Sequence, residues 1–359
     1  MVRTKQTGKP KLNGTPNGTP TNKKVPPPAP ESTIKSPSQP AELSDSDRQK
    51  LTSWLDKLEK PFSITTAPIS KKRKRESSTL QTQTDLFEPR LDIQYEVKPR
   101  QSWEVLRRYR KFTVGQESIA VGQSILVKHD TSEEAKIDIA AQWKGQVLEV
   151  RALDPEHVYI RVAWLNRPED LPGGRKSYHG KNELIPTNQM DVIDAMSVNG
   201  KLEVGHWEEK DDDSMLPMED QYFWRQTLDY GNMKTFSKLR HICIDKAPQN
   251  PDEMIIQCEN KDCRKWLHVK CIAEAAVEEA AGEKKKAKKT KPNPVAVSAK
   301  SSAVAIAEKN SYRAEIFIKG LPASGDSFPA GSTEISITAP GGEMKSKEMC
   351  CLFCGVGIE

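Results

Sequence analysis

Residues 158–184, VYIRVAWLNRPEDLPGGRKSYHGKNEL, contain the pattern that decides the fold. The side chains of the first half alternate between two faces, one with Ile160, Val162 and Trp164 and the other with Tyr159, Arg161 and Ala163. This period of two predicts a half-buried β-strand. The strand then meets Asn166, Pro168 and the Pro-Gly-Gly corner at residues 172–174, which open it into a loop. Trp164 therefore lies at a strand end, where an aromatic side chain is either core or one wall of a binding slot.

Further strand candidates flank this segment and are separated by clusters of Gly, Pro, Asp and Asn. They are residues 124–129, 142–153, 202–207 and 222–228, while residues 191–196 are either a strand or an irregular segment. Trp103, Leu106 and Tyr109 have helical spacing and predict a helix that packs these aromatics against the sheet. Because the strands do not alternate with helical patterns, the sequence predicts a mainly β, antiparallel, barrel-like fold.

The composition limits what the whole chain can be. Only 36% of its 359 residues are hydrophobic and 25 are Pro, so it cannot form one packed core. Apolar runs of about 18 residues are lacking, which predicts no membrane span, and the polar N-terminus does not read as a secretory signal. The seven Cys all lie between Cys243 and Cys354, and this odd count beside His predicts metal ligands in a reducing compartment. The sequence shows no nucleophile–base pair, phosphate loop or paired carboxylates, and we expect no enzymatic activity.

Several segments in one order resemble a known family. They are KFTVGQESIAVGQSILVKH, AWLNRPEDLPGGR, YHGKNELI, MDVIDAMSVNGK and QYFWRQTLDY, within residues 111–230. Together they resemble the bromo-adjacent homology (BAH) domain, in the version that fungal and plant chromatin proteins join to a PHD finger. The resemblance implies a nuclear protein that binds a histone tail on the nucleosome and takes part in gene silencing with other silencing-complex proteins.

The resemblance also implies a methyl-lysine pocket. In reader members of the family, an aromatic cage holds a trimethyl-lysine of histone three, because a quaternary ammonium is attracted to π faces and has no hydrogen-bond donor. By position, the walls are Trp143, Trp164 and Asn166, and the last replaces a residue that is usually aromatic. Tyr178 or residues 206–207 are alternative walls. The other open interpretation is that both indoles are plain core and the pocket is vestigial.

A loop after the corner extends this site. Tyr178, His179 and Asn182 match a loop that contacts the histone peptide in relatives. A buried structural role for His179 is the alternative that the sequence leaves open.

The Cys and His residues resemble the cross-braced ligands of a PHD finger, supported by the preceding string NPDEMIIQC. Zinc takes four such ligands per ion. Carried over by position, one site is Cys258, Cys263, Cys351 and Cys354, and the other is Cys243, Asp245, His268 and Cys271. Asp245 stands where the family has Cys, His241 is a competing ligand, and Cys350 is spare. A scaffold with a single zinc is the alternative. Trp266 is expected to pack, and no methyl cage is expected in the finger.

The predicted organisation has four parts. Residues 1–100 are a disordered region with a short helix at 45–60 and a basic run at 71–75, which reads as a nuclear import signal. Residues 101–236 are the BAH domain, and residues 237–273 with 311–359 are the divergent finger. Residues 274–310 are a flexible lysine-rich insertion that predicts weak contact with nucleic acid. Residues 3–7, RTKQT, also match the start of the histone three tail, either by chance or as a mimic.

The sequence thus predicts a chromatin adaptor whose BAH domain reads a methylated histone tail while the finger contacts a second tail or a partner. One alternative is a scaffold that has lost histone binding. Another is a RING-type ubiquitin ligase, which Trp266 and the string NPDEMIIQC argue against.

Overall fold

The structure is a computed structural model, and it describes residues 43–69, 79–129, 138–231, 234–283, 303, 305–318 and 333–358. These residues all fall in one compact unit, Pro40–Glu359. The histone-like start, the basic run at 71–75 and the lysine-rich residues 284–300 lie outside the described residues. In the described ranges, no helix has the length and apolar character that crossing a membrane requires.

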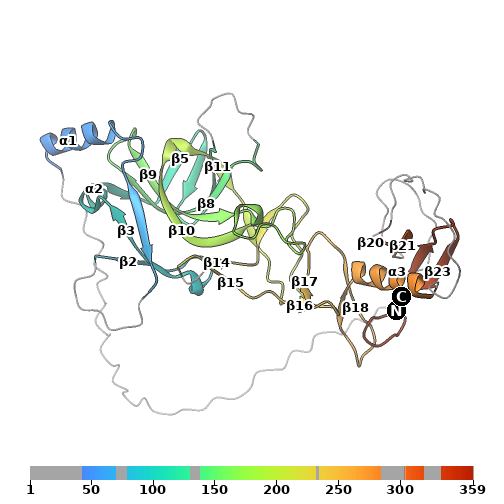
Figure 1. Cartoon of the computed structure of the whole chain (residues 1–359). Coiled ribbons are helices and arrows are strands. Elements are labelled where there is room, and N and C mark those ends of the chain that lie inside the picture. The colour runs from blue at the N-terminus through green and yellow to red at the C-terminus, as the bar shows by residue number, and fades with distance from the viewer. Residues whose placement is uncertain are drawn as a thin grey trace, which may run out of the picture. The chain divides into compact units, whose positions relative to one another are not determined.

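A central sheet of eight strands dominates the unit (Figure 1). Its path is β11 (Val198–Leu202), β7 (Ser124–Val127), β8 (Trp143–Ala152), β9 (Val158–Asn166), β10 (Ile185–Asp194), β14 (Leu228–Asp229) and β15 (Thr235–Phe236), with β4 (Arg107–Tyr109) paired to β8. β8, β9 and β10 are consecutive antiparallel strands. The mainly β prediction is therefore confirmed, with β9 in the middle of the sheet at the predicted residues.

Smaller elements surround this sheet. They are the hairpin β5 (Lys111–Val114) and β6 (Glu117–Ala120), the parallel pair β12 (Val204–His206) and β13 (Tyr222–Trp224), and the 3-10 turns η2 (Pro168–Asp170) and η3 (Ala195–Ser197). The predicted strands at 202–207 and 222–228 are each divided between two elements. Residues 191–194 are strand and the chain then turns at η3.

β9 is buried on both faces, whereas the alternation predicted a half-buried strand. Ile160 and Val162 lie in one hydrophobic cluster, and Tyr159 and Ala163 lie in a second cluster on the opposite face. The polar Arg161 is also buried, with its guanidinium 4.1 Å from the centre of the Tyr95 ring. The second face is covered by residues that come before the predicted domain.

Those covering residues correct the prediction that residues 1–100 are disordered apart from one helix. Within the described ranges they form α1 (Asp45–Leu55), β1 (Ser63–Ala67), β2 (Gln81–Gln83), η1 (Pro89–Leu91), β3 (Ile93–Lys98) and α2 (Arg100–Val105). Strand β3 lies between β1 and β2, and its alternating Ile93, Tyr95 and Val97 are buried. This apolar face removes the second face of β9 from water, which stabilises both segments.

Two helix predictions in this region need correction. The helix expected at 45–60 ends at Leu55, whose side chain is buried. In the second helix, Trp103 and Leu106 are buried as expected, but Tyr109 lies in β4 and is 43% exposed. Tyr109 is therefore not a core aromatic.

The C-terminal part, residues 237–358, is called the cysteine module here. It contains β16 (His241–Ile242), β17 (Ala247–Pro248), β18 (Ile255–Gln257), β19 (Trp266–His268), α3 (Val269–Glu283) and a sheet of β20 (Ala305–Lys309), β21 (Tyr312–Phe317), β22 (Glu334–Thr338) and β23 (Met344–Glu348). Helix α3 packs against this four-stranded sheet (Figure 1). Residues 269–283 and 305–309 are thus helix and strand, which corrects the flexible insertion predicted at 274–310. β21 and β22 are the two central strands of this sheet, and both contact α3.

Candidate functional site

The indoles of Trp143 and Trp164 lie together at the edge of one face of the central sheet. The register of β8 with β9 places Gly145 opposite Trp164, so Trp143, two residues before Gly145, lies on the same face. The two ring centres are 6.3 Å apart with an interplanar angle of 57°. Trp143 is 41% exposed and Trp164 is half-buried. The structure therefore brings these two predicted residues together, with Trp143 exposed and Trp164 packed in part against the hydrophobic cluster of Ile160 and Val162. The pair is called the aromatic slot here.

Gly145 explains how the Trp164 ring lies over the neighbouring strand. A Cβ built at Gly145 would be 3.4 Å from Cε3 and 3.5 Å from Cζ3 of Trp164, and 3.4 Å from the Ala163 carbonyl oxygen. A Cβ would therefore make ordinary van der Waals contact with the ring, and the branches of a larger side chain would need space beyond this contact. The absence of a side chain at this position is therefore part of the slot's shape.

Asn166 lies two residues after Trp164 on the same strand and so shares its face. Its Nδ2 is 3.5 Å from the Thr187 hydroxyl, which in turn donates a hydrogen bond of 3.0 Å to the Trp164 carbonyl oxygen. The side chain is half-buried. Asn166 thus occupies the predicted position and offers an amide where an aromatic ring was expected.

His129 is a slot neighbour that the sequence analysis missed. Its ring is stacked on Trp143, with centres 5.5 Å apart and planes 12° apart. Strand β7 places Val127 opposite Trp143, and His129 follows two residues later on the same side. No sequence motif marks His129, and only the register of β7 with β8 could have predicted its place beside Trp143.

The predicted peptide-contact loop makes internal contacts instead. His179 is buried, its Nδ1 accepts a 3.0 Å hydrogen bond from the Lys176 amide, and burial lowers its pKa to about 4. Asn182 donates a 2.7 Å hydrogen bond to the Glu219 carbonyl oxygen. The Tyr178 ring packs on that of His179, with centres 4.5 Å apart. This geometry favours the structural alternative for His179.

The side chains of residues 206–207, which the sequence offered as alternative walls, pack against other residues. His206 stacks on Trp224 with ring centres 3.9 Å apart. Trp207 is buried against the guanidinium of Arg225, which lies 5.1 Å from its ring centre. Neither side chain is therefore a substitute for the missing aromatic wall.

Arg225 joins the central domain to the cysteine module. Its side chain is fully buried and makes ion pairs of 3.0 Å with Glu183 and 2.8 Å with Glu209. It also donates hydrogen bonds to the carbonyl oxygens of Tyr178, at 2.6 Å, and Gln249, at 2.8 Å. Two carboxylates and two carbonyls thus compensate one buried guanidinium, as burial of a charge requires.

The first predicted metal site is assembled as expected. The ligand atoms of Cys258, Cys263, Cys351 and Cys354 all lie within 4.8 Å of one another. The Sγ atoms of Cys258 and Cys354 are 3.7 Å apart, and those of Cys263 and Cys351 are 3.8 Å apart. A tetrahedral ion with Zn–S bonds of about 2.3 Å requires Sγ–Sγ distances of about 3.8 Å. The four thiols therefore fit a tetrahedral metal ion.

The second predicted site is also assembled, with the departure at Asp245 included. Cys243, Asp245, His268 and Cys271 have their ligand atoms within 4.8 Å of one another. Nδ1 of His268 lies 3.3 Å from Asp245 and 3.7 Å from the Cys271 Sγ, and its Nε2 is buried without a hydrogen-bond partner in the described part of the chain. Nδ1 is therefore the ring atom that faces the cluster.

His241 and Cys350 do not join either cluster. His241 is exposed on β16, and Cys350 is half-buried with its Sγ 3.8 Å from the Glu348 carbonyl oxygen. Among the residues that the structure describes, the groups that could hold a metal ion are thus the two predicted sets of four.

The structure thus combines a mainly β domain that carries two neighbouring indoles with a module whose two clusters of four residues could each hold a metal ion. No family model matches the chain. Over 167 residues it is 29% identical to the chromatin remodeling protein SHL of Arabidopsis thaliana, covering 46% of this chain and 68% of that protein. Over 136 residues it is 29% identical to the chromatin remodeling protein EBS of the same plant, covering 38% of this chain and 57% of that protein.

A solved structure, that of the yeast Rsc2 BAH domain, is similar with a TM-score of 0.25 and 19% identity, over 37% of this chain and 54% of that one. The chain is thus similar to two plant chromatin remodeling proteins, which confirms the predicted resemblance to plant chromatin proteins. The match spans little more than half of the second relative. The assignment of the cysteine module as a PHD finger stays a prediction.

Proposed function

We propose that this protein is a nuclear chromatin adaptor that binds a methylated lysine of a histone tail in the aromatic slot. The observation that carries the proposal is the pair of indoles, Trp143 and Trp164, which lie 6.3 Å apart with the first 41% exposed and the second half-buried. A core role would bury both rings. The kinship with chromatin remodeling proteins supports a histone as the source of the lysine.

The slot chemistry favours a bulky, methylated ammonium. Each indole face contributes about 0.5–2 kcal/mol to binding of such a cation. We propose the stacked His129 ring as a further aromatic contact, since it lies beside Trp143. Asn166 contributes no π face, and its amide instead suits a lower methylation state or the peptide backbone. A repressive trimethyl-lysine of histone three is the ligand that we propose, with the dimethyl state as its closest competitor.

The cysteine module is proposed to be a divergent PHD-type finger that holds two zinc ions in its two clusters. We propose that it contacts a second tail or a silencing partner. Two weak contacts on one nucleosome would then combine, because the second binding event becomes intramolecular.

Calorimetry of the full chain tests the slot, with histone three peptides whose lysine carries none to three methyl groups. We expect Trp143→Ala and Trp164→Ala each to weaken binding of the methylated peptide about tenfold. Tyr109→Ala is the matched control, because Tyr109 has a similar exposure, 43%, and lies outside the slot. Methylated and unmethylated peptides that bind alike, or slot variants that behave as Tyr109→Ala does, would refute the proposal.

The second candidate is a structural scaffold of a silencing complex without histone reading. It is favoured by Asn166 in place of an aromatic wall and by the internal contacts of His179 and Asn182. The same calorimetry separates the two candidates, since a scaffold binds no peptide in a methylation-dependent way. A ubiquitin discharge assay tests the RING-type alternative.

A further inference from the structure

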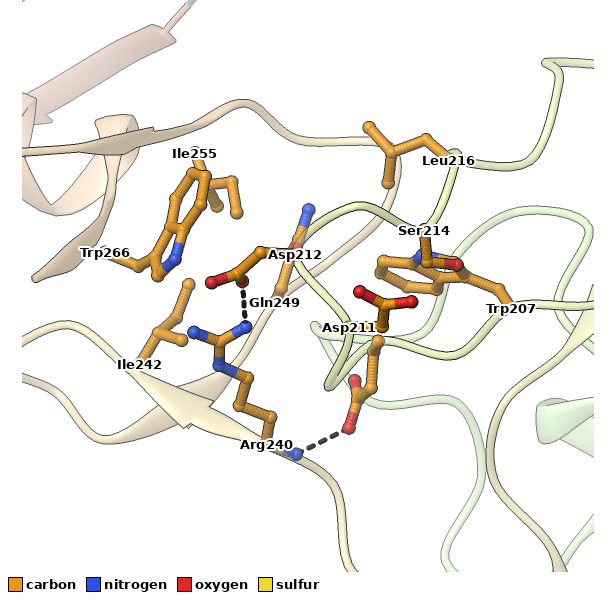
Figure 2. A pocket seen from close by; sticks show the side chains of 11 residues that line it. Trp207, Asp211, Asp212, Ser214, Leu216, Arg240, Ile242, Gln249, Ile255 and Trp266 are labelled. Carbon is orange, nitrogen blue, oxygen red and sulfur yellow. Dashed lines mark hydrogen bonds and ion pairs between the residues drawn. The ribbon is translucent and has the colours of Figure 1, made fainter. Parts of the chain in front are cut away.

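A cavity of about 380 Å³ lies where the central domain meets the cysteine module. It is called the junction pocket here. Figure 2 shows Trp266, Ile255 and Ile242 of the cysteine module on one side and Trp207 of the central domain on the other. Its volume falls in the range of small-molecule and side-chain pockets, about 300–1,000 Å³. The junction pocket is distinct from the aromatic slot, since the two share no lining residue.

The apolar walls of the junction pocket are held rigidly. Trp207 is buried, and the guanidinium of Arg225 lies over its ring. Trp266 lies on β19, whose partner strand β18 supplies Ile255, and Ile242 lies on the adjoining β16. Two indoles and two branched aliphatic side chains thus form walls against which a hydrocarbon chain can pack.

The polar part of the pocket is acidic and lies between the apolar walls. Asp211 and Asp212 project from a loop of the central domain (Figure 2). Arg240 pairs with Asp212, and Arg225 pairs with Glu209. Asp211 pairs with no basic side chain in the ranges that the structure describes, and it accepts only the Asp213 amide. One exposed carboxylate therefore remains uncompensated beside the two indoles.

The loop that carries these acids also presents apolar side chains to solvent. Met215 is 90% exposed, Met218 is 75% exposed and Leu216, 54% exposed, reaches the pocket itself. Exposed apolar side chains beside a cavity mark an interaction surface rather than a free-ion site. An acidic pocket with exposed apolar side chains at its edge fits a peptide that has a basic side chain followed by further residues.

We propose that the junction pocket binds an unmodified lysine side chain of a separate basic peptide. The hydrocarbon stem packs between Trp207 and Trp266, and the charged end pairs with Asp211. A carboxylate favours cations that keep N–H donors, because a charge-assisted hydrogen bond adds to the ion pair. A trimethylated lysine has no such donor, so this pocket selects against the modification that suits the aromatic slot.

NMR of the full chain labelled with ¹⁵N-tryptophan tests the proposal, since seven tryptophans give seven indole signals. The probes are one histone three tail peptide and two versions with its lysines trimethylated or replaced by norleucine. We expect the unmodified peptide to shift the Trp207 and Trp266 signals and the norleucine peptide to leave them unchanged. Shifts confined to Trp143 and Trp164 would overturn this inference without touching the proposed reader function.

Charge variants provide the quantitative test. We expect Asp211→Asn to weaken binding of the unmodified peptide about fivefold at low salt. Asp213→Asn, on the same loop but outside the pocket lining, is the matched control and should bind normally. Arg240→Gln should strengthen binding, because it removes a cation that already pairs with Asp212. Equal effects of Asp211→Asn and Asp213→Asn, or equal binding of the trimethylated peptide, would overturn the proposal.

The chain's own lysine-rich segment, residues 284–289, has the same chemistry as the proposed ligand. A variant with these lysines changed to glutamine distinguishes the two sources. If the change alone, without added peptide, shifts the Trp207 and Trp266 signals, the occupant is this segment, and the assignment to a separate peptide is wrong. Unchanged signals, with peptide binding retained, support the separate partner.

Discussion

The adjacent residues Cys350 and Cys351 offer a sharp test of the metal sites. Cys351 lies in the four-thiol cluster, with its Sγ 3.8 Å from that of Cys263, whereas Cys350 lies outside both clusters. We expect Cys351→Ser to lower the zinc content from two ions per chain to none, because the second cluster lies in the same cysteine module and the same hydrophobic cluster. Cys350→Ser should leave two ions bound, although it changes the neighbouring residue in the same way.

The expected consequence for stability follows from where the cluster lies. Cys258 and Cys351 are buried in the same hydrophobic cluster as α3 and β20–β22. A structural zinc site contributes about 10–16 kcal/mol in small metal-binding peptides, which is as large as the whole stability of a typical domain, about 5–15 kcal/mol. Loss of this ion should therefore unfold the cysteine module. The central sheet has separate hydrophobic clusters and should remain folded.

Two measurements check this prediction. Native mass spectrometry counts the ions, and hydrogen exchange reports whether protection is lost in the cysteine module while β8 and β9 stay protected. The reasoning fails if Cys350→Ser and Cys351→Ser lose the same amount of zinc, or if the wild-type chain purifies with none. Loss of protection across the central sheet in Cys351→Ser would also contradict it.

Three further predictions concern the central domain. Gly145→Val should displace the Trp164 ring, because the Cβ would already touch the ring at 3.4 Å and the two methyl groups would need further space. Calorimetry should then show no binding of the methylated peptide, while circular dichroism shows a retained fold. Burial lowers the pKa of His179 to about 4, below the ordinary value of about 6.5. Between these two pKa values the native state therefore binds fewer protons than the unfolded state, so the free energy of unfolding should fall as the pH drops from about 6.5 to about 4. In urea unfolding at several pH values, His179→Gln should show a smaller dependence of this free energy on pH. Arg225→Met leaves two buried carboxylates without their cation and should lower the free energy of unfolding by about 3–5 kcal/mol. The control Arg100→Met removes an exposed ion pair and should lower it by less than about 1 kcal/mol.

Local patterns predicted the parts of the fold that depend on nearby residues. Strand β9 was found at its observed bounds because its alternation is regular and its ends are marked by Asn166 and Pro168. The eight metal-ligand candidates were found because the order of the Cys and His residues resembles the cross-braced ligands of a PHD finger, and the structure brings each predicted set of four together.

The missed elements depend on partners that are distant in sequence. The alternating run at β3 is as regular as that of β9, but it lies in a polar region rich in Pro and Lys, and only the uncovered face of β9 gives it something to pack on. Arg225 reads as an ordinary surface residue in the sequence. Its burial requires Glu183, 42 positions away, and Glu209, 16 positions away, and no local pattern joins these three residues.

Asn166 and Asp245 are two positions where the chain departs from the family that it resembles, and in the structure each side chain lies beside the other candidate residues of its site. The Asp245 carboxylate lies 3.3 Å from Nδ1 of His268 and 3.4 Å from Sγ of Cys271, so an oxygen is available in the cluster where the family has a sulfur. Asn166 lies on the slot face, within 3.5 Å of Thr187, so an amide replaces a ring in the same place. Each substitution therefore changes the chemistry of a site that is still assembled. A degenerating scaffold would lose assembly as well as chemistry, because nothing would keep the remaining side chains facing one another. The retained geometry at both positions is the stronger reason to favour an altered binding preference over a lost one.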